Sequence, residues 1–363
     1  MFHFRQTRSE EMEKWNQFVA QNDSIFGGML QSWEWGEFQK GSNHLVWRFI
    51  AEENDIWHMV AQIIRLDLPL GKFLFYVPHG PIVAQNSFFQ KECTIQLESF
   101  LIFLKKFTKE NNALFLRIDF PFLESFPKIR FFRSQNGIKA ARDIEPSETV
   151  FTDLHQQNDE IFLGFKPKTR YNIRVAQKHG VEIKKIDPKN NEAFIIFYSL
   201  LKETARRQGF FLHPEKYYRM MFSLLPSHFF SFFMALLGKQ YIGGALIINF
   251  GGVATYLHGG FQYEKRSVMA PYLLHWEIMQ WAKAHGALFY NWNGVRLEEK
   301  KITWLQKLYR RESTSRSSWE GITRFKFSFS KKEDVIKTLG TFEFPARKFL
   351  YKAYHFRDIL LHG

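Results

Sequence analysis

Between Phe229 and His258 the sequence reads FFSFFMALLGKQYIGGALIINFGGVATYLH, a series of apolar runs interrupted by glycines. Runs rich in aromatic and β-branched residues between turn residues are typical of strands. We expect three strands here, at Phe229–Leu237, Ile242–Phe250 and Ala254–His258. A helix should follow from Pro271 to His285, because proline favours the first turn of a helix and Gly286 stands just past its end. This order of elements predicts an α/β fold.

Gln240 to Ala245 (QYIGGA) fits the loose Q-x-x-G-x-A pattern that holds the coenzyme A diphosphate in GNAT acetyltransferases. Such a loop must lead into a helix, because the N-terminal amides of that helix bind the phosphate. Here it leads into Ala245–Phe250, a predicted strand. The sequence therefore favours a hairpin turn with closely packed glycines.

Two series of elements with a similar order lie around this stretch. The first contains a helix at Ser9–Gln21, an aromatic-rich segment at Leu30–Gln39, strands at Trp47–Ala51, Trp57–Leu66 and Phe73–Val77, a helix at Ser87–Asn111 and a strand at Ala113–Asp119 that ends before Pro121. The second adds strands at Val150–Leu154 and Val181–Ile186 and helices at Lys168–His179, Glu192–Arg207 and Pro214–Leu224. A boundary is expected near Ile144–Glu148, and a length of 363 residues agrees with two domains.

The composition is that of a folded, basic protein. Hydrophobic residues make up 45% of the chain, with 41 Phe, which is ample for packed cores. The formal net charge of +14 favours a polyanionic partner such as RNA, a nucleotide diphosphate or an anionic membrane face. Solubility without a specific partner is the alternative explanation of this charge.

A cytoplasmic location is predicted. Cys93 is the single cysteine, so no intramolecular disulfide can form, and we expect it to pack within a helix. No signal peptide is expected at Met1–Arg8, and the longest apolar run, Phe229–Gly238, is too short to span a bilayer.

Several catalytic signatures are absent from the sequence. It contains no Walker phosphate loop, no G-x-G-x-x-G, no G-x-S-x-G and no H-E-x-x-H motif. The 13 His residues lack ligand spacing, so neither a metal nor a cofactor is predicted.

A set of short motifs occurs in order along nearly the whole chain. These are Gln31–Lys40 (QSWEWGEFQK), Tyr76–Pro81 (YVPHGP), Leu116–Asp119 (LRID), the basic helix from Lys166 to Val181, Ala270–Glu277 (APYLLHWE), Tyr290–Val295 (YNWNGV) and Arg324–Phe329 (RFKFSF). In identity, order and spacing they resemble the motifs of the Fem family of peptidoglycan aminoacyltransferases. Arg296–Ser318 is too short and too polar for the family's helical arm, so the chain is similar to the arm-less FemX type.

The resemblance implies two tandem GNAT-like domains with mixed sheets flanked by helices, the C-terminal segment returning to the first domain. Residues 1–146 with 333–363 would bind the precursor, and residues 147–332 would face the aminoacyl-tRNA. The implied reaction transfers an amino acid from aminoacyl-tRNA to the side-chain amine of the stem peptide. The acceptor would be UDP-MurNAc-pentapeptide or lipid II.

Two residues are candidates for the chemistry. Attack on the aminoacyl ester needs a neutral amine, and Asp119 at a strand end could position or deprotonate it, although a local turn contact explains this acid equally well. The resemblance gives Lys326 the role of stabilising the oxyanion; alone, it would be a solvated charge among strand aromatics. Ser328 and Ser330 replace glycines that are frequent in the family.

Six residues are predicted to contact substrate. Lys40 and Arg207 would clamp the diphosphate, and Phe211 replaces a tyrosine of related enzymes. Tyr256 and His258 lie two apart on a strand and should therefore point to one face, the peptide channel, unless Tyr256 is an ordinary core residue. Tyr218 completes this set.

Two basic clusters are candidate contacts for the tRNA acceptor end, although charge runs are usually solvated faces. The tentative residues are Lys168, Arg170, Arg174, Lys307, Arg310 and Arg311. The C-terminal stretch Pro345–Leu361 combines apolar and basic residues and could dock on an anionic membrane leaflet, or on the protein's own first domain.

Two other functions remain open at this point. An acyl-CoA-dependent N-acyltransferase would share the GNAT fold but needs the coenzyme A loop before a helix. A non-catalytic RNA-binding module would explain the charge but not the ordered motifs, and aromatic-rich RNA motifs are absent.

Overall fold

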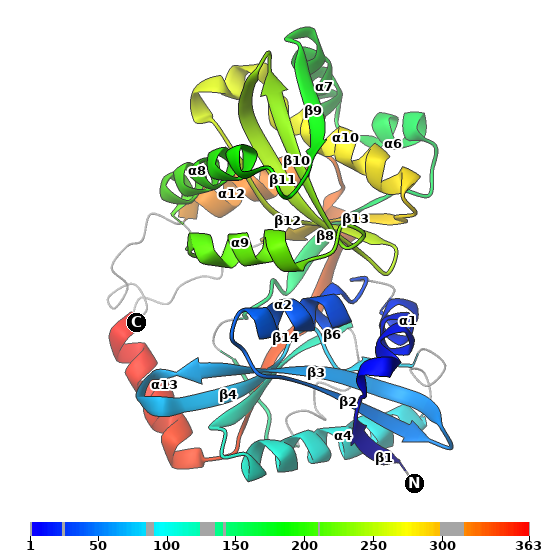
Figure 1. The fold of residues 1–363 in the computed structure, drawn as a ribbon, viewed down its shortest axis with the longest axis vertical. Helices are drawn as coiled ribbons and strands as arrows, with labels where there is room; N and C mark the ends of the chain where they lie inside the picture. The colour runs from blue at the N-terminus through cyan, green and yellow to red at the C-terminus, as the bar shows by residue number, and fades with distance from the viewer. Residues whose placement is uncertain are drawn as a thin grey trace. The chain divides into compact units, whose positions relative to one another are not determined.

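A computed structural model describes residues 2–23, 26–84, 91–123, 135–140, 143–209, 211–297 and 316–362. Among these residues the chain divides into two compact units. Residues up to Ser147 and from Lys337 onward form unit 1, and residues between Glu148 and Ile336 form unit 2. The chain therefore completes unit 1 with its last segment (Figure 1).

Unit 1 contains a mixed sheet with the strand order β1-β2-β3-β4-β6-β14. Its neighbours are antiparallel except β4 and β6, which are parallel. A parallel neighbour needs a long crossover, and here the crossover contains helix α4. The strands are β1 (His3–Gln6), β2 (Val46–Glu53), β3 (Ile56–Leu68), β4 (Lys72–Val77), β6 (Phe115–Leu123) and β14 (Val335–Pro345), with short β5 (Ile82–Val83) beside β3 and β7 (Ile138–Lys139) beside β14.

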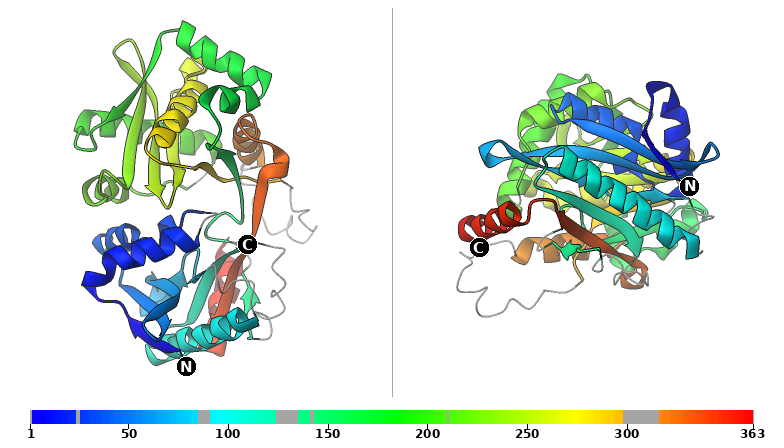
Figure 2. Two further views of the ribbon diagram at one scale, coloured as in Figure 1. Left: turned by 90° about the vertical axis from the view of Figure 1, so that its right-hand side faces the viewer. Right: turned by 90° about the horizontal axis from the view of Figure 1, so that it is seen from below.

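Helices cover both faces of this sheet. They are α1 (Met12–Asn22), α2 (Trp33–Gly41), α4 (Lys91–Glu110) and α13 (Lys348–His362). Helix α4 lies along one face (Figure 2), where Phe100 and Leu104 join a core with Phe75 and Leu116. The alternate residues Leu74 and Tyr76 pack on the other face, against Tyr351 of α13. One strand thus supplies both layers, as the two-residue period of a strand requires.

Unit 2 repeats this plan, with the strand order β8-β13-β12-β11-β10-β9. Here β12 and β13 are the parallel pair, and helix α10 forms the crossover between them. The strands are β8 (Glu148–Asp153), β9 (Val181–Ile186), β10 (Phe230–Leu237), β11 (Gln240–Phe250), β12 (Val253–Phe261) and β13 (Phe289–Gly294). In each unit the antiparallel neighbour of the crossover strand comes from elsewhere in the chain: β14 beside β6, and β8 beside β13.

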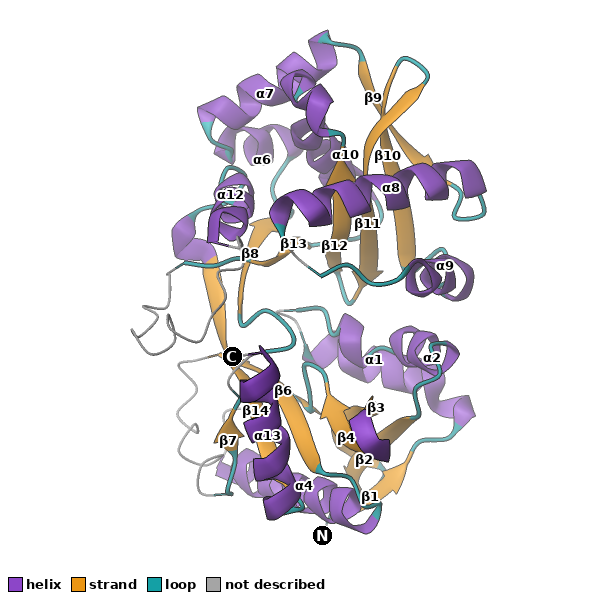
Figure 3. Cartoon of the chain, turned by 90° about the vertical axis from the view of Figure 1, so that its left-hand side faces the viewer, coloured by secondary structure: helices purple, strands orange, loops and turns teal. Residues whose placement is uncertain are grey.

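The helices of unit 2 also form two layers. They are α6 (Asn158–Gly164), α7 (Pro167–Lys178), α8 (Asn191–Gln208), α9 (Glu215–Leu224), α10 (Ala270–Ala284) and α12 (Arg316–Lys326). Figures 1 and 3 show α8 and α10 on opposite faces of the sheet. Adjacent residues of β10 separate the two layers, because Phe232 contacts Phe222 of α9 and Phe233 contacts Trp281 of α10.

Two expectations about strands can be tested directly. A hairpin is present, but its turn lies at Gly238–Lys239, and the residues expected to form the turn, Gln240–Ala245, instead begin β11 next to β10. A Cβ at Gly243 would lie 2.0 Å from the Phe261 ring, so this glycine is closely packed. The coenzyme A loop therefore lacks the helix that it needs.

The expected end of the strand at Asp119 is wrong. Strand β6 continues through Pro121 to Leu123. The partner strand shifts register between Thr338 and Gly340, opposite this segment. A bulge tolerates proline, because no ladder hydrogen bond is required from its nitrogen.

Gly260 sets the distance between α8 and β12. A Cβ there would lie 2.8 Å from the backbone carbonyl carbon and oxygen of Leu200 and 2.9 Å from the backbone nitrogen of Leu201. Backbone atoms of a packed helix cannot move aside as a flexible side chain can. Only glycine fits this contact without displacing α8.

We expect Gly260→Ala to lower the free energy of unfolding by about 1–3 kcal/mol, the usual cost of overpacking a core. Gly321→Ala in α12 is the matched control, since a Cβ there meets nothing within 4 Å, and it should be neutral or stabilising by up to about 1 kcal/mol. Urea unfolding monitored by circular dichroism measures both. Equal midpoints for the two variants would show that α8 does not need this close approach.

Candidate functional site

Lys326 lies at the C-terminal end of α12, in the interior of unit 2. Its ammonium donates a hydrogen bond to the Gly294 carbonyl at the end of β13, with an Nζ–O distance of 2.6 Å, and lies 6.0 Å from the centre of the Tyr256 ring. Only 6% of Lys326 is exposed. The interpretation as a solvated charge among strand aromatics is therefore wrong. Phe325 and Phe329 are one helical turn apart, so both rings face the core, where Phe329 is buried and Phe325 is partly buried.

Aromatic side chains enclose this lysine. The His275 ring lies 4.6 Å from the Tyr256 ring and 4.7 Å from the Trp292 ring, between centres. Burial lowers the pKa of Lys326 from 10.5 to about 7, because an apolar surrounding disfavours the charged ammonium. At neutral pH a large share of Lys326 is therefore uncharged.

His275 is a buried neutral imidazole beside the lysine. Its Nδ1 lies 2.8 Å from the Tyr290 hydroxyl, and Nε2 is buried with no hydrogen-bond partner among the described residues. Burial, and then the charge of Lys326, lower the pKa of His275 to about 3. The sequence contained this histidine in the APYLLHWE motif, but a histidine on an apolar helix face gives no sign of its neighbours.

The two serines after Lys326 fit the local backbone. Neither lies in the left-handed region that would require glycine. The Ser328 carbonyl accepts hydrogen bonds from the Lys166 amide and the Thr169 hydroxyl of the α7 N-terminus. The Ser330 hydroxyl lies 2.9 Å from the Thr152 hydroxyl. These contacts fix the turn that follows the lysine.

Tyr256 and His258 point to opposite faces of the sheet, so the expectation of a shared face is wrong. Leu246 pairs with His258 and Ile247 pairs with Tyr256, which leaves Leu257 as an extra residue in β12. Such a bulge breaks the alternation of a strand. Tyr256 consequently packs on His275 of α10, whereas His258 packs on Tyr218 of α9, with ring centres 5.2 Å apart.

Tyr218 and His258 form a second aromatic cluster in unit 2. His213 joins them, with its ring 6.2 Å from that of His258. The Tyr218 hydroxyl is buried and has no partner among the described residues. Burial, and then His213, lower the pKa of His258 to about 3, so this histidine is neutral at physiological pH.

Arg207 and Phe211 lie near the end of α8. Arg207 contacts Glu203, 3.2 Å away, and its guanidinium carbon is 4.8 Å from the centre of the Tyr263 ring. Phe211 is 85% exposed. Both side chains are accessible from solvent, as substrate contacts must be.

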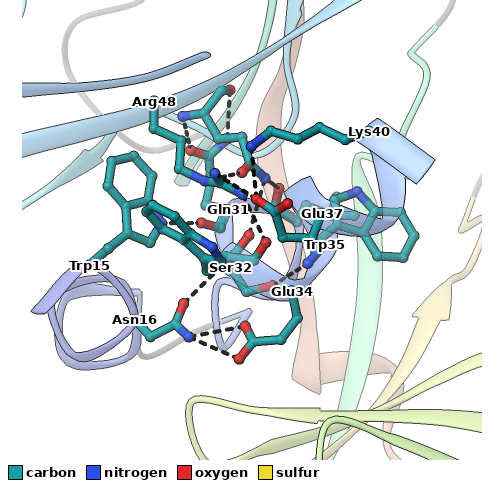
Figure 4. Close-up of polar contacts among 12 residues, drawn as sticks. Trp15, Asn16, Gln31, Ser32, Glu34, Trp35, Glu37, Lys40 and Arg48 are labelled. Atoms are coloured by element: carbon teal, nitrogen blue, oxygen red, sulfur yellow. Dashed lines mark hydrogen bonds and ion pairs between the residues drawn. The ribbon is translucent and has the colours of Figure 1, made fainter. Parts of the chain in front are cut away.

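In unit 1, Lys40 is held at the end of α2 by a chain of charges (Figure 4). Its ammonium donates to Glu37 at 2.9 Å, and Glu37 also contacts the Arg48 guanidinium at 3.0 Å. Arg48 is 4% exposed and donates to the Gln62 side chain and to the Trp33 carbonyl, at 2.9 and 2.8 Å. A buried arginine thus orients an exposed lysine, an arrangement that the sequence did not reveal.

Asp119 lies inside unit 1 with both carboxylate oxygens occupied. Tyr76 donates to one oxygen and Thr341 donates to the other. Asp119 is 2% exposed, and its burial raises its pKa, a rise that the hydrogen bonds from Thr341 and Tyr76 oppose. Its backbone carbonyl also accepts from the Gly80 amide, 3.0 Å away. The carboxylate therefore ties β4, β6 and β14 together.

Most of the chain matches one family model. Residues 10–125, 134–240 and 238–358 match the FemAB family. The chain belongs to the FemAB family. It is accordingly a tRNA-dependent aminoacyltransferase of peptidoglycan bridge synthesis, with aminoacyl-tRNA and a peptidoglycan precursor as its substrates.

Individual relatives agree with this membership. The chain is 22% identical over 368 residues to the lipid II:glycine glycyltransferase of Staphylococcus epidermidis, which covers 78% of this chain and 85% of that protein. It is 26% identical over 220 residues to the protein of the same name from Staphylococcus aureus strain MRSA252, covering 57% of this chain and 49% of that protein.

Solved structures confirm the fold. The crystal structure of FemX matches with a TM-score of 0.78 at 18% identity, over 97% of this chain and 99% of that chain. A tandem GNAT protein from the clavulanic acid biosynthesis pathway matches with a TM-score of 0.55 at 10% identity, over 95% and 99%. The tandem GNAT-like architecture expected of a FemAB protein is thus present.

The basic residues of this FemAB protein lie partly on α7. Lys168 and Arg174 are exposed, whereas Arg170 is half-buried and donates to the carbonyls of Leu163 and Phe165. Arg170 therefore holds the α6–α7 connection. Lys307, Arg310 and Arg311 lie outside the described residues, as does most of Arg296–Ser318, and no described helix has the length and apolar character needed to cross a membrane.

The burial of Lys326 can be measured without any substrate. Its folded pKa of about 7 lies below the ordinary 10.5, so between these values the unfolded chain binds more protons than the folded one. The free energy of unfolding should therefore rise with pH across this window. In Lys326→Met this rise should be smaller.

Urea unfolding at pH 7 and at about pH 9.5 tests this difference, with Arg324→Ala as the control because Arg324 is an exposed cation on the same helix. A Lys326→Met variant with the same pH dependence as the wild type would mean that the lysine is solvated.

Proposed function

We propose that this FemAB protein transfers an amino acid from aminoacyl-tRNA to the side-chain amine of the stem peptide in the lipid-linked precursor, lipid II. The observation that carries the proposal is the ammonium of Lys326, which is buried within unit 2 and, among the described residues, is bonded to a single backbone carbonyl. The lipid-linked acceptor is supported by the relatives named lipid II:glycine glycyltransferases. Glycine is the donor to test first for the same reason.

Lys326 is proposed to stabilise the transition state. In the reaction the amine nitrogen attacks the ester carbonyl carbon, the oxygen of that carbonyl gains negative charge, and the bond to the ribose oxygen breaks. An ammonium has three N–H donors, and in the described part of the chain only one of them has a partner, the Gly294 carbonyl. A free donor in a dry site favours the developing oxyanion strongly. That charge in turn keeps the proton on the lysine.

Asp119 is proposed to position the precursor site rather than to act as the base. A base must touch the amine whose proton it takes, and this carboxylate is 2% exposed with both oxygens already hydrogen-bonded. Its contacts with Tyr76 and Gly80 instead hold the turn after β4. The proton of the attacking amine is proposed to leave with the ribose oxygen.

Lys40 of unit 1 is proposed to bind the diphosphate of the precursor, and Arg207 of unit 2 is proposed separately as a phosphate contact; both are exposed cations, held by Glu37 and Glu203. An acidic partner at each cation fixes its direction without burying it. Phe211 is proposed to contact the ligand of Arg207 without a hydroxyl group. Tyr218, Tyr256 and His258 are proposed to shape the peptide and aminoacyl pockets on the two faces of β12, and Lys168 and Arg174 to meet tRNA phosphates.

The direct test is to incubate the purified protein with charged tRNAs and either UDP-MurNAc-pentapeptide or lipid II, and to follow the acceptor mass. We expect lipid II to gain the mass of one aminoacyl unit, and the gain to disappear after RNase treatment. Lys326→Ala should slow transfer about a hundredfold or more, as loss of an oxyanion donor does. Arg324→Ala should transfer normally. Transfer from an acyl-CoA instead, with no use of tRNA, would refute the proposal.

The role of Asp119 has its own test, the Asp119→Asn variant. An amide can accept from only one of the two hydroxyl donors, so the free energy of unfolding should fall by about 1–3 kcal/mol. Because the proton path is unaffected, kcat/KM should fall less than about tenfold, whereas loss of a general base costs about 10²–10⁴-fold. A folded variant with a loss in that larger range would make Asp119 the base. Thermal melting and steady-state rates give the two quantities.

A further inference from the structure

One end of unit 1 carries apolar side chains that the fold does not use. The most exposed large apolar residues in the described part of the chain are Phe349 at 92%, Leu70 at 89% and Phe211 at 85%. Leu70 lies in the turn between β3 and β4, and Phe349 lies in the first turn of α13. Two of these three residues thus belong to elements of the same unit.

The β3–β4 turn and the start of α13 are neighbours. The Leu114 amide donates to the Phe73 carbonyl, and the amides of Ala346 and Arg347 donate to the Leu114 carbonyl, at 2.9, 3.1 and 3.2 Å. Leu66 and Leu68 pack in one cluster with Tyr351. Figures 1 and 2 show α13 beside the end of the β3–β4 hairpin. The two exposed side chains therefore lie at one end of the unit.

The described side chains that fix helix α13 lie on one of its faces. Tyr351 is buried against Phe115 and donates to Glu343 at 2.7 Å, and Tyr354 packs on the same cluster. Phe349 lies two residues before Tyr351 and is directed away from this face. Because Tyr351 and Tyr354 fix the orientation of α13, Phe349 stays exposed to solvent.

Leu70 occupies a position that favours glycine. Its φ of 62° lies in the left-handed region, which costs energy for a side chain with a Cβ. Packing within the described part of unit 1 does not offset this cost, because the Leu70 side chain is almost completely exposed. A leucine at such a position indicates a use outside the folded chain.

The charge around these two residues is positive. Four exposed basic residues lie here: Lys72 at the start of β4, Arg347 just before α13, and Lys348 and Lys352 on α13. Two nearby acids among the described residues already have partners: Asp67 is paired with Arg65 at 2.8 Å, and buried Glu343 is paired with Arg117. Protruding apolar side chains among lysines fit an interface between anionic lipid headgroups and acyl chains, where the apolar tips enter and the ammonium groups meet phosphates.

We propose that the β3–β4 turn and the first turns of α13 form a docking surface for an anionic lipid bilayer. Leu70 and Phe349 enter the headgroup region, and Lys72, Lys348 and Lys352 bind the lipid phosphates. The surface rests on the proposed function in one respect, because a lipid-linked acceptor gives the enzyme a reason to approach the membrane. The basic residues favour an anionic lipid surface. A second copy of this chain would bring the same positive charge and be repelled.

Co-sedimentation with vesicles tests the surface without any acceptor. We expect the protein to bind phosphatidylglycerol vesicles, to release them at high salt, and to bind phosphatidylcholine vesicles weakly. Leu70→Asp and Phe349→Asp should each weaken binding about tenfold or more, the effect of one large apolar side chain. Ile56→Asp is the matched control, because Ile56 is 63% exposed at the opposite end of β3.

The Leu70→Gly variant tests whether weaker vesicle binding could come from misfolding. Glycine suits the positive φ, so this variant should be at least as stable as the wild type and still bind vesicles more weakly. Activity adds a second readout: the three variants should lose transfer to vesicle-borne lipid II and keep transfer to a soluble precursor analogue with the same stem peptide.

Two results would overturn the docking surface. One is equal binding of wild type and variants to phosphatidylglycerol vesicles, and the other is self-association through this end in place of vesicle binding. If instead vesicles bind as expected but no precursor gains mass, the docking surface stands and the proposed transfer reaction fails. The two ideas are therefore tested separately.

Discussion

The pairing of β6 with β14 is the constraint on which unit 1 depends. It joins residues 115–123 to residues 338–345, so the first unit cannot close until the last segment of the chain is in place. Three interactions follow from this ladder. Thr341 reaches Asp119, Arg117 forms an ion pair with buried Glu343, and Glu343 holds Tyr351 of α13. The carboxylate at the candidate precursor site and the helix with the exposed apolar residues therefore share one origin, a strand contributed from the far end of the sequence.

In unit 2 the strand beside the crossover strand, β8, comes from the start of the same unit. This unit also contains a buried lysine. Strand β8 precedes the rest of the unit, so α12 is free to pack against the end of β13. A lysine in an apolar core is costly, because burial disfavours its charge. The cost is limited by the bond to Gly294 and by the fall of the pKa to about 7. A group that can be neutral in the empty site and charged opposite an oxyanion suits acyl transfer.

The fold was predictable from local patterns, whereas the site was predictable only in part. Apolar runs and helix ends located many of the strands and helices, although α12, which carries Lys326, was taken as a strand, and the parallel pairs follow from the crossovers that α4 and α10 provide. The faces of Tyr256 and His258 were not predictable, because the extra residue Leu257 appears only when β11 and β12 are in register. Without the family resemblance Lys326 likewise looked solvated, since its neighbours Tyr256 and His275 are distant in sequence. Arg48 behind Lys40 depends on the β2–β3 pairing, which leaves no local trace.

The position of Lys326 follows from where the parallel ladder stops. Strands β12 and β13 pair only from Val253–Phe289 to Thr255–Asn291, although β12 continues to Phe261 and β13 to Gly294. Beyond the last pair the bulge at Leu257 turns β12, and the Gly294 carbonyl becomes available to a side chain. The ammonium of Lys326 meets that carbonyl. A fully paired ladder would give this carbonyl a backbone partner and leave no room for an ammonium. The irregular pairing of β12 could not be predicted from the sequence. It is also the feature that accompanies the buried lysine in the core of unit 2.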